Sequence, residues 1–184
     1  IKRHKMITRR KLLKIAPIGM SFMVPEFSLA QSVDPDRGIK LVVPFPAGAL
    51  TDSLGRMIAE RLRPILGQSI VVENRPGAGT LLGASVIAKS PPDGYSLLVA
   101  TSSTLAISPS LYANPPAITS DFVGVAMIGS VSLFLVTRKD LKVNNLAELV
   151  EEMRKRPGTL NFASPGSGTM HHLIVETIKV QEKV

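Results

Sequence analysis

The stretch "IKLVVPFPAGALTD", residues 39–52, decides the fold, because it leads from a strand through a tight turn directly into a helix. Residues Ile39–Val43 are mostly apolar, which is typical of a strand that is buried on both faces. Two prolines and a glycine then mark a turn. Apolar residues recur at helical spacing from Thr51, the candidate N-cap, to Leu66, and Gly67 predicts the end of the helix.

The same alternation of strand and helix continues along the chain. Two further apolar runs, Ser69–Asn74 and Ser96–Ala100, predict strands, and Thr80–Lys89 between them predicts a second helix. The order β-α-β-α-β indicates an α/β fold with a parallel sheet that helices cover on both faces. We therefore assign residues 39–122 to a first lobe, which follows a polar linker over residues 31–38.

Residues 123–184 predict part of a second lobe. The apolar stretch Asp121–Asp140 is long enough for two strands, or for one strand that crosses between lobes. A helix is expected over Leu146–Arg156, with Asn144 or Asn145 as its cap. The segment "LNFASPGSGTMHHLIVETIK" then repeats the opening design of strand, small-residue turn and helix.

The formal net charge of +8 is concentrated at the N-terminal end of the sequence. Residues 1–30 carry a net charge of +6, which leaves +2 for the rest of the chain. The rest of the chain is therefore close to neutral, and the sequence has no Trp and only two Tyr that could stack on bases. Both features argue against nucleic-acid binding.

Residues 1–30 have the pattern of a secretory signal peptide. The pair Arg9-Arg10 resembles a twin-arginine export motif, and Ser28-Leu29-Ala30 offers small residues to a signal peptidase. A basic amphipathic helix is the alternative, but prolines interrupt it, and the apolar run is shorter than the ~20 residues of a membrane span. We expect an exported, periplasmic protein that begins at Gln31 and, having no cysteine, lacks disulfides and zinc thiolates.

Two strand-to-helix turns share one composition and predict the binding site. The first turn is Val43–Gly48, before Thr51, and the second turn is Ala163–Gly168, before Thr169. Parallel sheets bind ligands at the carboxyl ends of their strands, where helix N-termini offer free amides. Neither turn contains Lys or Arg, so a small carboxylate fits better than a polyphosphate. The alternative is that both turns are ordinary connections whose glycines only make tight corners.

Other motifs give no sign of a cofactor, a metal or a catalytic residue. Gly166 and Gly168 lack the third glycine of a dinucleotide fingerprint, and the chain has no P-loop. The adjacent His171 and His172 would point in different directions from a helix, and no acid stands at a metal-ligand spacing. Ser167 does not lie in the nucleophile elbow of a hydrolase.

Four motifs in order, "VPFPAGALTD", "VVENRPGAG", "PPDGYSLLVATSSTLAISPSLY" and "LNFASPGSGTMHHL", resemble the Bug family, the extracytoplasmic solute receptors of tripartite tricarboxylate transporters. The resemblance runs from about Ile39 to Glu176. It implies a two-lobed α/β fold of the periplasmic-binding-protein type (type II). It also implies that the lobes close on a small carboxylate, such as a di- or tricarboxylate, an acidic amino acid or an aromatic acid, and that the partners are the membrane subunits of a transporter.

The resemblance further implies ligand contacts from the two turns, from the end of the third strand and from a histidine after the second turn. The second turn would grip a carboxylate through amides and hydroxyls, and the first turn would act partly through ordered waters. The implied residues are Phe45, Pro46, Ala47, Gly48, Asp52, Thr101, Ser102, Ser164, Gly166, Ser167, Gly168, Thr169 and His172.

The sequence departs from the family in two places. Ala49 stands where the family usually has a second glycine, which is expected to reshape the first turn. The sequence ends at Val184, whereas family members continue, so we expect an incomplete second lobe with an open sheet edge. Two other functions stay open: an exported hydrolase that uses Ser167 and His172, and a truncated receptor fragment without function.

Overall fold

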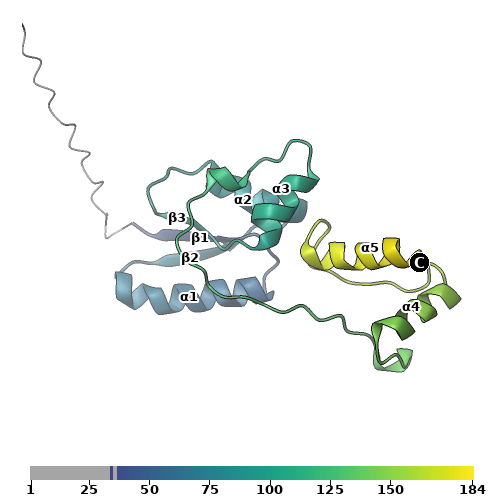
Figure 1. Cartoon of the computed structure of the whole chain (residues 1–184). Coiled ribbons are helices and arrows are strands. Elements are labelled where there is room, and N and C mark those ends of the chain that lie inside the picture. Colours follow the sequence, from purple (N-terminus) through teal and green to yellow (C-terminus); the bar gives the residue numbers. More distant parts are fainter. Residues whose placement is uncertain (1–33, 35–36) are drawn as a thin grey trace, which may run out of the picture. The chain divides into compact units, whose positions relative to one another are not determined.

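The computed structural model describes residue 34 and residues 37–184, which carry the colours of the sequence in Figure 1. The predicted signal peptide and residues 31–33 and 35–36 of the predicted linker lie outside the described residues. Cleavage before Gln31 therefore stays a prediction.

The first lobe is built on a three-stranded parallel sheet in the order β2-β1-β3. The strands are β1, Ile39–Val43; β2, Ile70–Asn74; and β3, Ser96–Leu98. The central strand forms parallel ladders with both neighbours, which explains why Val42 and Val43 are fully buried. The predicted parallel sheet is confirmed, although β3 ends before the expected Ala100.

Two helices cover opposite faces of this sheet (Figure 1). Gly55 of the first helix lies against Val43, and Gly83 of the second helix lies against Pro44. Because successive side chains of a strand point to opposite faces, the two helices contact different sides of β1 and of its extension. The helices are α1, Leu50–Leu66, and α2, Leu81–Ala88.

The end of α1 follows the prediction, but its start does not. Gly67 closes the helix in the left-handed conformation, with φ of 67°. Thr51 is not the N-cap: that position belongs to Ala49, and the helix begins at Leu50. The Thr51 hydroxyl oxygen is sealed from solvent and has no hydrogen-bond partner in the described residues.

After β3 the chain forms a π-helical turn, Ser103–Ile107, and the short helix α3, Ser108–Leu111. The second-lobe helices follow the prediction closely. They are α4, Leu146–Lys155, and α5, Met170–Glu182. The Asn145 side chain caps α4 by accepting a hydrogen bond from the Glu148 amide at 3.0 Å.

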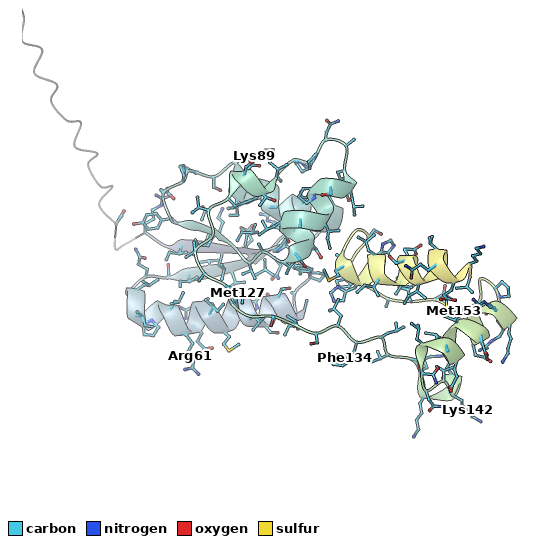
Figure 2. All side chains as sticks on the ribbon, in the orientation of Figure 1. Arg61, Lys89, Met127, Phe134, Lys142 and Met153 are labelled. Atoms are coloured by element: carbon cyan, nitrogen blue, oxygen red, sulfur yellow. The ribbon has the colours of Figure 1, made fainter. Side chains whose placement is uncertain are left out.

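The strands expected in the second lobe are absent from the described residues. The chain has no strand between residues 121 and 140, nor at Leu160–Ala163. Met127 and Phe134 project from an extended segment and are 86% and 84% exposed (Figure 2). A strand exists only when a neighbouring strand pairs with its amides and carbonyls, and no described segment provides that neighbour. The prediction of strands from apolar composition alone was therefore wrong here.

The buried carboxylate of Asp52 fixes the loop that leaves β1. It accepts hydrogen bonds from the Gly48 amide at 2.8 Å, from Arg56 Nε at 3.1 Å and from Asn74 Nδ2 at 2.9 Å. The same Asn74 amide group also donates to the Phe45 carbonyl at 3.1 Å. The first turn, α1 and the end of β2 are thus tied together through one side chain that is only 3% exposed.

These contacts also set the charge of Asp52. Hydrogen bonds to the carboxylate lower the pKa of Asp52 from 3.8 to about 2. The bond from the Gly48 amide has the largest effect, followed by those from Arg56 and Asn74. Burial opposes this effect without reversing it. At neutral pH the group is therefore a carboxylate whose charge is balanced by Arg56.

We expect Gly83→Ala to lower the free energy of unfolding by about 2 kcal/mol, because overpacking a close contact costs energy. A β-carbon there would lie 2.8 Å from Pro44 Cβ and 2.9 Å from the Arg75 carbonyl oxygen. Gly129→Ala is the control, since nothing lies within 4 Å of its added carbon. Equal urea midpoints for the two variants would contradict this packing.

Asp52→Asn should lower the free energy of unfolding at neutral pH by about 2 kcal/mol, since it weakens charge-assisted hydrogen bonds. The folded-state pKa of Asp52 lies below its ordinary value, so its contribution is present above about pH 4 and is lost as the pH falls toward 2. Urea titrations should show a larger loss over this interval for the wild type than for Asp52→Asn.

Asp140→Asn is the matched control for that experiment. Its carboxylate is 69% exposed and pairs with Arg138 at 3.3 Å, so it should change the free energy of unfolding by less than about 1 kcal/mol. An Asp52→Asn variant as stable as this control would show that the Asp52 contacts do not hold the loop.

Candidate functional site

Three loops of small residues surround a cavity of about 240 Å³, here called the site cavity, beyond the carboxyl ends of β1 and β2. The first turn and a loop after β2 belong to the first lobe, and the second turn precedes α5. Tyr112, directly after α3, also lines the cavity. The lining residues are Pro44, Phe45, Pro76, Gly77, Ala78, Gly79, Thr80, Tyr112, Pro165, Gly166, Ser167 and Thr169.

The first turn contributes its buried part to the site cavity. Phe45, which is 5% exposed, lines the cavity. Pro46, Ala47 and Gly48 are exposed and do not line it, and Asp52 holds the turn from behind through the Gly48 amide. The turn is therefore a fixed wall of the cavity.

The second turn is fastened at its junction with α5. Thr169 is only 1% exposed. Its hydroxyl donates a hydrogen bond to the Gly166 carbonyl at 2.7 Å. The amide of Met170 donates to Ser103 Oγ at 3.1 Å, which ties the start of α5 to the segment after β3. The turn that begins the second-lobe helix is thus anchored on a buried side chain of the first lobe.

A third loop, Pro76–Thr80, is the part of the site that sequence analysis missed. It follows β2 and ends in a 3₁₀ turn over Ala78–Thr80, so α2 begins one residue later than predicted. Ser108, fully buried, donates its hydroxyl to the Gly79 carbonyl. The signal was present, because "RPGAG" repeats the proline and glycine composition of the two predicted turns.

The third loop and the second turn lie against each other. A β-carbon on Gly79 would lie 3.3 Å from the Ser167 carbonyl oxygen, and one on Gly168 would lie 3.8 Å from the Gly79 Cα. Gly79 has no room for a side chain, because an added β-carbon would also lie 2.8 Å from Ser108 Oγ, whereas Gly168 is required by its φ of 80°. Glycine at these two places therefore lets the loops meet beside the site cavity.

Free backbone donors gather in these two loops. The amides of Ala78, Gly79, Ser167 and Gly168 donate to no residue that the structure describes. No Lys, Arg, His, Asp or Glu is among the residues that line the cavity. An uncharged cavity with spare N–H donors suits a small anion that is bound through amides and hydroxyls.

Several predicted site residues lie elsewhere. Thr101 makes hydrogen bonds of 3.4 Å to Thr104, Ser102 is exposed, and neither lines the cavity. Ser164 contacts the Gly166 carbonyl at 3.5 Å. Of the thirteen implied residues, those that line the cavity are Phe45, Gly166, Ser167 and Thr169.

His172 lies beside the second turn without lining the cavity. Its ring lies 5.9 Å from that of Phe162, and its Nε2 is 4.0 Å from Glu176. Its Nδ1 is buried and has no partner in the described residues. No hydrogen bond joins it to Ser167 in that part of the chain.

Among the described residues, no helix has both the length and the apolar character of a membrane span. No group of three or more His, Cys, Asp or Glu side chains in residues 34 and 37–184 could hold a metal ion.

Comparison with known proteins identifies relatives among transport receptors. The family model described as tripartite tricarboxylate transporter family receptor matches residues 54–184. Protein BugT of Bordetella pertussis is 39% identical over 171 residues, which cover 91% of this chain and 52% of BugT. A UPF0065 protein from the tcbD-tcbE intergenic region of Pseudomonas sp. (strain P51) is 36% identical over 170 residues, which cover 91% of this chain and 49% of that protein.

Solved structures show the same fold. MatC from Rhodopseudomonas palustris with bound malate has a TM-score of 0.71 and 28% identity, covering 82% of this chain and 52% of MatC. Rpa4515 of R. palustris with adipate has a TM-score of 0.66 and 30% identity, covering 82% of this chain and 50% of that one. The periplasmic binding protein BugD has a TM-score of 0.60 and 29% identity, covering 82% of this chain and 50% of BugD.

The chain spans about half the length of the curated relatives and solved structures that it matches. Within that span it has the α/β periplasmic-binding-protein fold that the sequence predicted. The match of the family model to residues 54–184, together with 39% identity to BugT over 91% of the sequence, shows that this chain belongs to the tripartite tricarboxylate transporter family of receptors.

Proposed function

We propose that this chain belongs to an exported receptor that captures a small carboxylate and delivers it to the membrane subunits of a tripartite tricarboxylate transporter. One observation carries the proposal: the site cavity has no charged lining residue, and free amides of two loops stand beside it. Such a cavity recognises a carboxylate by hydrogen bonds and does no chemistry on it.

The positions of the loops support a carboxylate over a larger anion. The site cavity, about 240 Å³, is small. The second turn leads directly into α5, a helix of 13 residues whose N-terminus carries a partial positive charge. MatC and Rpa4515 are described with malate and adipate, and both compounds are dicarboxylic acids.

The proposed ligand class also includes tricarboxylates, acidic amino acids and aromatic acids. Backbone amides that bind one carboxylate group do not specify the chemical structure of the rest of the ligand. Residues 1–30, rich in Lys and Arg, support export, as does the periplasmic description of BugD. We therefore place the receptor in the periplasm.

An exported hydrolase that uses Ser167 and His172 is the competing function. A hydrolase needs its nucleophile within hydrogen-bond reach of its base. His172 instead lies beside Phe162 and Glu176, and the relatives are described as transport receptors. Ester turnover by the purified protein, lost in Ser167→Ala, would favour the hydrolase.

Calorimetric titration with malate, adipate, citrate, glutamate and benzoate should detect binding of at least one acid. Gly168→Val should then weaken binding at least about tenfold, or by about 1.4 kcal/mol. Gly168 has φ of 80°, and a β-carbon there would lie 3.5 Å from Leu111 and 3.8 Å from Gly79. His171 is exposed, so His171→Ala should bind like the wild type.

Gly158→Val controls for backbone strain in this experiment. Gly158 has φ of 71° and nothing lies within 4 Å of an added β-carbon, so its variant shares the strain but not the site. Equal losses of affinity in Gly168→Val and in either control variant would show that the second turn does not hold the ligand.

A further inference from the structure

We infer that Thr80 is a specificity-determining residue whose hydroxyl donates a hydrogen bond to the carboxylate of the captured ligand. The inference rests on the proposed function and adds a loop, Pro76–Thr80, to the binding machinery. It starts from a buried side chain whose polar atom has no partner.

The Thr80 hydroxyl is buried and unpaired. The residue is 3% exposed, and its Oγ1 is sealed from solvent and makes no hydrogen bond within the described residues. Leaving a buried hydroxyl without a partner is costly, so native structures rarely keep one without a reason. Thr80 is among the residues that line the site cavity, so a rearrangement of its side chain would bring the sealed hydroxyl within reach of a ligand.

The backbone of the third loop is held in an unusual conformation that keeps Thr80 at the cavity. Ala78, Gly79 and Thr80 have φ of 47°, 60° and 87°. A β-branched residue rarely adopts such an angle, and the surrounding structure must impose it. Two hydrogen bonds do so: Ser108 donates to the Gly79 carbonyl, and the Thr80 amide donates to the Gly77 carbonyl at 2.9 Å.

The neighbouring donors define the chemistry of the partner. The free amides of Ala78 and Gly79 lie in the same loop as the Thr80 hydroxyl, and those of Ser167 and Gly168 lie in the turn packed against it. A carboxylate accepts several hydrogen bonds and has no proton to donate at neutral pH. The Thr80 hydroxyl would therefore act as a donor beside the amides and would favour acids over isosteric amides or alcohols.

Thr51 provides a matched control within the same chain. Its Oγ1 is also sealed from solvent and unpaired in the described residues, but Thr51 lies in α1 and does not line the site cavity. Replacing either threonine by valine keeps the shape and removes the unpaired hydroxyl. An effect on stability that comes only from removing a buried hydroxyl should appear in both Thr80→Val and Thr51→Val. A loss of ligand binding should appear in Thr80→Val alone.

The experiment measures the affinity for malate, adipate and citrate by calorimetry, and the melting temperature without ligand. Thr80→Val and Thr80→Ala should bind at least about tenfold more weakly, which is the effect expected for one hydrogen bond to a charged group. Thr80→Ser, which keeps the hydroxyl, and Thr51→Val should bind like the wild type. Both valine variants should melt at or above the wild-type temperature, because an unpaired hydroxyl has been removed.

Wild-type affinity in Thr80→Val or in Thr80→Ala would overturn the inference and leave the proposed function standing. An equal loss in Thr80→Ser would also overturn it, because the hydroxyl would then be irrelevant. If the wild-type chain binds none of the three acids, both this inference and the proposal that this chain captures a carboxylate are contradicted.

Discussion

The geometry of the site depends on the hydrogen bonds of one buried carboxylate. Asp52 joins the Gly48 amide of the first turn, Arg56 in its own helix and Asn74 at the end of β2. The third loop begins two residues after Asn74, so the Asp52 side chain helps to position two of the three walls of the site cavity. Because the donors surround the carboxylate, it is a structural group and offers no free charge to a ligand.

The three loops become one site through ties made by buried hydroxyl groups. Ser103 accepts from the first amide of α5, and Ser108 donates to the carbonyl of Gly79. Both serines lie in the π-helical turn and short helix after β3, a region that looks like an interruption of the α/β pattern. This interruption holds the second turn and the third loop, and it leaves their amides free for a ligand.

Much of the first lobe could be predicted because its signals are local. Periodicity identified β1, α1 and β2, and Gly67 marked the end of α1 correctly. The missing strands after residue 121 depend on a pairing partner, which composition does not reveal. The third loop was missed although "RPGAG" resembles the other turns, because only the structure brings Gly79 against Ser167. Thr51 looked like a helix cap, but Asp52 reaches the Gly48 amide instead.

The absence of charged side chains from the cavity lining affects how the receptor responds to its surroundings. Attraction between exposed charges weakens as the ionic strength rises, whereas short hydrogen bonds inside a cavity are screened much less. No carboxylate, imidazole, ammonium or guanidinium group is among the residues that line the cavity. Under the proposed function, the group in the cavity whose charge changes in mildly acidic medium is the ligand, which as a carboxylic acid loses its charge below about pH 4. Under the proposed function, such a cavity would therefore lose little of its affinity for a carboxylate as the salt concentration rises.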